Sequence, residues 1–393
     1  MSKLEVYHQC GNNTVWNIDS FTKDNVGNGL ILSPSDIKKE DLEKLDSEIK
    51  KCSMFDSQFY LPRSNKPKIM TYEFFPSQCI EDEYSTKNYE EVAYENAEKC
   101  IKFQLQNQFK NIIIPTVYAE DYTSNYLEGL KYTYVLPFIE ESKKLGIDKK
   151  IFLTMIIKDS YLKDENIEKE LLSFATNFQN IDGIYLIPVH KETNKRIKDE
   201  EYLFRMMRFI DILRDNDLLV HLGYTDIEAL VLSIAGITSL SIGTYENTKC
   251  FGIDKFVKAE GKKQGPTPRI FSAALLQNIE YRFLPSLKTL YDKYNMLFDE
   301  NKYRVEMFEP TFNWHFSKPA IYKHYFISYN NILIQLPESY EEKYNFILDR
   351  IQKSMIYFKE ISEVVLLDEK NDGDHLVHWI NAMRMFDKYK KSK

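Results

Sequence analysis

Seven short apolar segments recur along this chain, and each of them ends in a polar residue. They span residues 29–34, 54–60, 111–118, 150–159, 183–190, 218–226 and 239–247. Most are followed by a stretch with the apolar spacing of a helix. Strands that are buried on both faces are continuously apolar, and their alternation with helices is typical of parallel β–α units. The pattern predicts an α/β fold, a (β/α)8 barrel of the TIM type.

The polar residues that end these segments indicate where chemistry would take place. In a closed ring of β–α units, the active site lies at the carboxyl ends of the strands. The polar residues fall at those ends, so we expect an enzyme with its site at that mouth of the barrel.

The eighth strand is the part of the barrel that the pattern does not define. Either residues 279–285 close the barrel, or the barrel is irregular at this point. Residues 1–28 are rich in polar and turn residues, and we expect an N-terminal extension there. We expect the barrel over 29–299. The chain from 300 to 393 has amphipathic helical spacing and predicts a C-terminal helical region packed on the barrel.

Composition excludes several classes of protein. The 393 residues contain no run near the roughly 18 apolar residues of a membrane span. The N-terminus lacks the pattern of a secretory signal, so we expect a cytoplasmic protein without a membrane partner. Five scattered cysteines indicate reduced thiols instead of a disulfide framework or a cysteine-built zinc site. No glycine-rich phosphate loop or compact metal-ligand spacing occurs, and we expect neither cofactor nor metal.

The first candidate catalytic residue is Asp56, within the segment FDSQFY. A carboxylate inside an apolar strand is costly unless it is paired or catalytic. Alternate residues of a strand share a face, so Gln58 and Tyr60 would point the same way and bind substrate. The alternative is that Asp56 only satisfies backbone amides or pairs with Arg63.

Three further residues are candidates for catalysis at later strand ends. His221 could donate a proton at neutral pH, or be a hydrogen-bonded core residue. Glu246 directly follows an apolar segment and could be a base or nucleophile. Asp159 could be a second carboxylate beside Asp56, since two carboxylates in different environments divide acid and base roles. The neighbouring polar residues would bind substrate: Tyr224, Tyr245 and Asn247.

A basic segment follows the seventh apolar run. The net charge of −7 disfavours indiscriminate nucleic-acid binding, but residues 255–269 carry five positive charges against one negative. Lys262, Lys263 and Arg269 could contact phosphates beside the barrel mouth, which would make a nucleic acid or nucleotide the partner. The alternative is a solvated surface loop.

The layout resembles the tRNA-guanine transglycosylase-like barrels, which modify guanine in nucleic acid. The stretch FDSQF resembles the aspartate-bearing segment early in that family, and residues 248–272 resemble its basic segment after a late strand. The resemblance implies that Asp56 is an acid on the base side. Glu246 is the carboxylate nearest the position expected for the nucleophile, where the family has aspartate. The cysteine-rich zinc motif and the glycine-rich loop of the family are missing.

Two hypotheses follow from these features. The first is a carboxylate-dependent barrel enzyme that cleaves or exchanges a glycosyl bond in a nucleoside or nucleic acid. The second is a non-catalytic barrel module that binds a ligand or a protein partner in a larger assembly. A metal-dependent hydrolase is a third, weaker alternative, because the candidate residues are of suitable ligand types.

Overall fold

Eight parallel strands form a nearly closed barrel in the computed structural model, which describes residues 3–80, 86–123, 125–190, 196–258 and 265–393. The strands pair in the order β3-β2-β1-β8-β7-β6-β5-β4. A backbone hydrogen bond of 2.8 Å from Lys110 to the carbonyl of Ser53 links the two ends of this series. The strands are β1 Glu5–Gln9, β2 Gly29–Leu32, β3 Met54–Phe55, β4 Ile112–Ile114, β5 Ile151–Lys158, β6 Gly183–Val189, β7 Leu219–Thr225 and β8 Ser239–Gly243.

All seven predicted strands are confirmed, but the remaining strand is β1 and not residues 279–285. β1 pairs in parallel with both β2 and β8, so residues 1–28 are not an extension laid across the barrel. In the sequence EVYHQ only Val6 and Tyr7 are apolar, and two polar residues that follow, His8 and Gln9, are nevertheless fully buried. The strand therefore lacks the continuous apolar run that marks the others.

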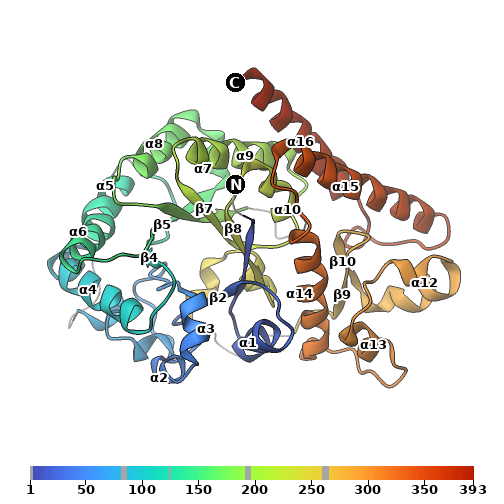
Figure 1. Cartoon of the computed structure of the whole chain (residues 1–393), viewed down its shortest axis with the longest axis horizontal. Coiled ribbons are helices and arrows are strands. Elements are labelled where there is room, and N and C mark those ends of the chain that lie inside the picture. The colour runs from blue at the N-terminus through green and yellow to red at the C-terminus, as the bar shows by residue number, and fades with distance from the viewer. Residues whose placement is uncertain (1–2, 81–85, 124, 191–195, 259–264) are drawn as a thin grey trace.

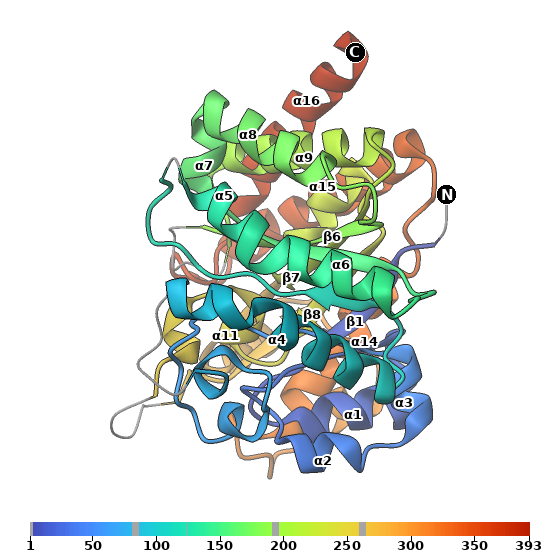
Figure 2. The same ribbon diagram turned by 90° about the vertical axis from the view of Figure 1, so that its left-hand side faces the viewer.

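Helices cover the outside of the ring. Figure 1 shows them around the strands, and the quarter turn of Figure 2 brings α4 and α6 in front of the sheet. Some of them begin at a side chain that accepts the first backbone amides, as Asp164 does before α8 and Asp199 before α9. They are α1 Thr14–Lys23, α2 Lys39–Glu43, α3 Ser47–Cys52, α4 Thr86–Gln106, α5 Tyr126–Leu130, α6 Leu136–Lys144, α7 Asp159–Lys163, α8 Glu165–Thr176, α9 Glu200–Asp215, α10 Ala229–Leu232 and α11 Glu246–Lys249.

A small lobe is inserted after the last barrel strand. An antiparallel hairpin, β9 Arg269–Ser272 with β10 Gln277–Glu280, occupies the region where a closing strand was expected. It is followed by α12 Leu284–Leu290 and α13 Lys302–Phe308, and these elements share their own hydrophobic cluster. Figure 1 shows this lobe beside the barrel, to the right of α14.

Helix α14 (Pro319–Leu333) completes the outer ring of the barrel. Its Phe326 meets the ring of His8 on β1 edge-on, with centroids 4.7 Å apart. Its Tyr329 donates to the backbone carbonyl of Asp226 at 3.1 Å. The region from residue 300 is therefore not only an appendage, because α14 takes the place of the eighth barrel helix.

The last two helices lie on the outside of this ring. They are α15 Tyr340–Ser362 and α16 His375–Ser392, within the region predicted to be helical. The indole of Trp379 on α16 donates to the carbonyl of Ile197 at 3.0 Å, which fixes α16 beside α9. Within the described ranges, no helix is both long and apolar enough to cross a bilayer.

Candidate active site

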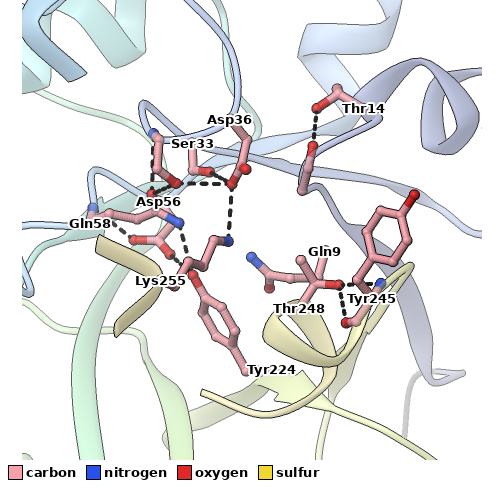
Figure 3. Close-up of polar contacts among 12 residues, drawn as sticks. Gln9, Thr14, Ser33, Asp36, Asp56, Gln58, Tyr224, Tyr245, Thr248 and Lys255 are labelled. Atoms are coloured by element: carbon pink, nitrogen blue, oxygen red, sulfur yellow. Dashed lines mark hydrogen bonds and ion pairs between the residues drawn. The ribbon is translucent and has the colours of Figure 1, made fainter. Parts of the chain in front are cut away.

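Asp56 lies at the carboxyl end of β3, and its carboxylate is fully buried. Its backbone amide extends the strand by bonding to Leu32 at 2.9 Å. The hydroxyl of Tyr60 donates to both carboxylate oxygens at 2.9 Å, and the backbone amide of Gln58 donates to Oδ1 at 3.0 Å. Tyr224 approaches Oδ2 at 3.5 Å. The structure therefore brings together four of the predicted site residues, and Figure 3 shows three of them, Asp56, Gln58 and Tyr224.

Burial sets the protonation of this carboxyl. Loss of solvent around Asp56 raises its pKa from 3.8 to about 6, although the hydrogen bonds from Tyr60 and Gln58 and the charge of Lys255 act in the opposite direction. A carboxyl group with a pKa near 6 can give up or accept a proton close to neutral pH, as general acid–base catalysis requires.

Two residues beside Asp56 have a left-handed backbone that only glycine adopts easily. Gln58 has φ 53° and Tyr224 has φ 54°. Their side chains bond to each other, with the Gln58 amide donating to the Tyr224 hydroxyl at 2.8 Å. The pairing of β7 with β8 shifts register between Leu222 and Thr225, so Tyr224 lies in a bulge that redirects its side chain. Backbone strain of this kind is concentrated at functional sites.

A buried ion pair lies next to Asp56. The ammonium of Lys255 is 3.0 Å from the carboxylate of Asp36, and the two side chains are only 3% and 10% exposed. Asp36 also accepts hydrogen bonds from Ser33 and Ser35, at 3.1 and 2.9 Å. Lys255 was expected on the basic surface loop, but it points into the barrel mouth (Figure 3). One cation therefore lies among two carboxylates in the same buried cluster.

Aromatic side chains cover the cluster. Phe251 and Phe256 lie edge-on to Tyr60, with centroids at 5.1 and 5.2 Å, and both are almost completely buried. Tyr224 lies edge-on to Phe251 at 5.4 Å. Phe251 and Phe256 therefore contribute to the complete burial of Asp56.

His221 is not at the mouth of the barrel. It is the third residue of β7, buried between Tyr7 and Tyr185, and its Nδ1 lies 2.8 Å from the hydroxyl of Ser239. Burial lowers its pKa to about 3, so the ring is neutral near pH 7 and cannot be the expected proton donor. A mid-strand position places it deeper in the barrel than the residues that follow each strand.

Glu246 and its neighbours lie on another part of the rim. Glu246 and Asn247 are exposed at the start of α11. Tyr245 accepts a hydrogen bond from Asn13 at 2.6 Å and contacts Trp16 and Tyr322. These three residues do not join the Asp56 cluster; Tyr245 and Glu246 border a cleft between the barrel and α14.

The other candidates are also separate from Asp56. Asp159 is the first residue of α7 and forms an ion pair with Lys163 at 2.9 Å. Arg269 begins β9 and pairs with Glu280 at 2.7 Å. Lys262 and Lys263 lie outside the described residues. The four expected catalytic residues therefore do not converge on one pocket.

Three residues of the cluster were missed by the sequence analysis: Gln9, Asp36 and Lys255. Gln9 ends the strand within the segment predicted as an extension, and Asp36 lies just outside the apolar segment 29–34. The signal for Asp36 is its position just after the apolar run 29–34, as for the other site residues. Nothing in the sequence indicates that Lys255 turns inward.

No group of three or more potential metal ligands is found among the histidines, cysteines and carboxylates of the described ranges.

Comparison with known proteins adds little. No family model matches the chain, and no curated protein matches it. Among solved structures, CbXyn10B in its native form is 14% identical over 61% of this chain and 83% of its own, with a TM-score of 0.37. An endo-1,4-beta-xylanase from Caldicellulosiruptor owensensis is 13% identical over 61% and 84%, with a TM-score of 0.36. Such a likeness carries no argument about activity, and the fold assignment rests on the strand order.

Proposed function

We propose that the chain is a carboxylate-dependent barrel enzyme that breaks or exchanges a glycosyl bond of a nucleoside, free or within a nucleic acid. Asp56 is its acid–base residue. The observation that carries the proposal is the state of this carboxyl: it is fully buried at the carboxyl end of a barrel strand, with its pKa raised to about 6.

The surroundings of Asp56 suit a flat, polar ligand. Tyr60, Tyr224, Phe251 and Phe256 present aromatic surfaces, on which a nucleobase can stack. Lys255 and Asp36 place both signs of charge within the same cluster, and charge develops on both sides of a glycosyl bond as it breaks.

The reaction assigns one role to Asp56. The bond between the anomeric carbon and the base breaks, and its electron pair stays on the leaving nitrogen. The protonated carboxyl of Asp56 gives its proton to the base. Water or an incoming base then forms the new bond to the anomeric carbon and gives up one proton to the Asp56 carboxylate, which restores the acid. Asp36 is the nearby carboxylate that would stabilise the positive charge at that carbon. Because Glu246 is exposed and distant from this cluster, it has no role in the step.

A base-release and exchange assay tests the proposal. Purified protein is incubated with ribonucleosides, deoxyribonucleosides, bulk tRNA and duplex DNA, and released or exchanged base is quantified by chromatography. Asp56→Asn should lower the rate by a factor of about 100 or more, since it removes general acid catalysis. Asp148→Asn, at an exposed position, is the matched control and should keep full activity. Equal rates in the wild type and Asp56→Asn would refute the role of Asp56.

The second candidate is a non-catalytic barrel module, and the cover over Asp56 favours it. With Phe251 and Phe256 in place, the carboxylate has no contact with solvent. A module of this kind would show no base release from any of these substrates. It would still bind a partner equally well when Asp56 is replaced by Asn.

A further inference from the structure

The side chain of Gln9 is a buried hydrogen-bonding group at the end of β1, and no part of the proposed reaction uses it. It is completely buried. The hydroxyls of Tyr185 and Ser241 donate to its carbonyl oxygen at 3.1 and 2.8 Å. Two donors on one oxygen fix the plane of the amide and determine which way its NH2 group points.

The orientation of Gln9 depends on a close contact built into β7. The ring of Tyr185 lies against Gly223, where an added Cβ would be 2.7 Å from the ring and from its hydroxyl. Any larger residue at 223 would push Tyr185 away and release the Gln9 carbonyl. The absence of a side chain at this position lets Tyr185 reach across the barrel to Gln9.

The NH2 group of Gln9 has no acceptor among the described residues. Its Nε2 is buried and makes no hydrogen bond to any residue in the part of the chain that the structure describes. Figure 3 shows this nitrogen directed toward Lys255, on the side of the cluster that holds Asp36 and Asp56. An unsatisfied buried donor costs roughly 1–3 kcal/mol, a cost that a ligand with a suitably placed acceptor removes.

We infer that Gln9 is a substrate-binding residue whose NH2 group donates to an acceptor atom of the bound nucleobase, either a ring nitrogen or a carbonyl oxygen. The inference rests on the proposed function, because it assumes that a nucleobase enters the Asp56 cluster. Gln9 would then fix the base against the carboxyl that protonates it. Nucleosides that lack the acceptor would leave the NH2 group unsatisfied and bind more weakly.

The test pairs a change in the protein with a change in the ligand. Binding of adenosine and guanosine is measured by calorimetry, together with their 7-deaza and 3-deaza analogues, which lack the N7 and the N3 acceptor. Inosine is compared with purine riboside, which lacks the O6 acceptor. The wild type should bind one of these analogues about tenfold more weakly than its parent. Gln9→Met, of similar size but without an amide, should bind both members of that pair equally.

Controls separate binding from folding. Gln9→Glu keeps an acceptor for Tyr185 and Ser241 but replaces NH2 by oxygen, and it should remove the same discrimination. Gln352→Met, at an exposed position on α15, should behave like the wild type. Circular dichroism is recorded for each variant so that a loss of fold is recognised.

Each outcome decides a specific point. If the wild type and both Gln9 variants all bind an analogue more weakly than its parent nucleoside, another donor bonds to the acceptor and the inference is overturned. If no analogue is discriminated but nucleosides bind and react, Gln9 only supports the fold, and the proposed function stands without it. If no purine nucleoside binds the wild type, the inference is overturned. If, in addition, no base is released from or exchanged in the tRNA and DNA of the first assay, the substrate class of the proposed function is also wrong.

Discussion

At the scale of single residues, the proposed acid–base chemistry depends on the position of Asp56 and on the groups around it. A buried carboxyl with hydrogen-bond donors on both oxygens would ordinarily remain ionised, but complete burial outweighs those donors and raises its pKa to about 6. Tyr60 and Tyr224 are held near the carboxyl, and the strained backbone of Tyr224 and Gln58 is maintained by their mutual hydrogen bond. The chemistry is therefore set by position within the barrel instead of by a sequence motif.

A stability measurement tests this view of Asp56. Because the folded-state pKa lies above the unfolded value, the folded protein holds the proton more tightly than the unfolded chain does. The stability that this proton contributes is fully present below about pH 4 and is lost as the pH rises through 6. In Asp56→Asn this loss is absent.

The free energy of unfolding of Asp56→Asn, relative to that of the wild type, should therefore rise by about 2–3 kcal/mol between pH 4 and pH 7. Urea titrations at several pH values measure it, with the exposed Asp148→Asn as the control. A relative stability that does not depend on pH would show that Asp56 is not the buried titrating group described above.

At the scale of elements, the barrel mouth is closed by a short turn, Ile253–Phe256, which brings Lys255 to Asp36. Removing one partner of a buried ion pair leaves the other charge buried without compensation, and such changes cost about 3–5 kcal/mol. Lys255→Met and Asp36→Asn should each destabilise the protein by an amount in that range. The double variant Asp36→Asn/Lys255→Met should be clearly more stable than the sum of the two losses predicts.

Urea unfolding of the four proteins in this cycle gives the coupling energy. Additive losses would mean that the two side chains do not interact, and the turn would then be held over the mouth by its other contacts, such as the hydrogen bond from Ser64 to the Phe256 carbonyl.

The elements also show how far the sequence predicts the fold. Seven strands are evident as apolar runs, because each is buried on both faces. β1 is not evident, because it buries two polar side chains, His8 and Gln9. His8 bonds to the carbonyl of Val26, and the carbonyl oxygen of Gln9 accepts from Tyr185, contacts that only the folded barrel shows. The ends of the predicted strands indicate four residues of the site, which are Asp56, Gln58, Tyr60 and Tyr224. Lys255 does not, because only the closed barrel shows that its loop folds inward.

At the scale of the whole molecule, the chain is a barrel in which a small lobe separates the eighth strand from the eighth outer helix. The hairpin β9–β10 with α12 and α13 lies between β8 and α14, and α14 returns to cover β1. Sequence reasoning placed the end of the barrel at residue 299 because no local signal distinguishes a helix of the outer ring from a helix of an appendage.

Truncation of one α14 side chain tests this architecture. Phe326 is fully buried against His8, so Phe326→Ala should destabilise the whole protein by about 3–5 kcal/mol, as in a barrel core. Ile334→Ala, 42% exposed just after the helix, should change stability by less than about 1 kcal/mol. Chemical denaturation measures both. A loss below about 1 kcal/mol for Phe326→Ala would indicate that α14 is only loosely attached to the barrel.

In the proposed reaction, the buried carboxyl of Asp56 supplies the proton when a glycosyl bond breaks. The pH dependence of kcat/KM for base release or exchange tests it most directly. We expect kcat/KM to be constant at low pH and to fall above a pKa of about 6, where Asp56 loses its proton. In Tyr60→Phe the decline should begin at higher pH, because the lost hydrogen bond stabilises the ionised carboxylate. A rate that is independent of pH between 5 and 8, or a decline that does not move in Tyr60→Phe, would contradict the claim.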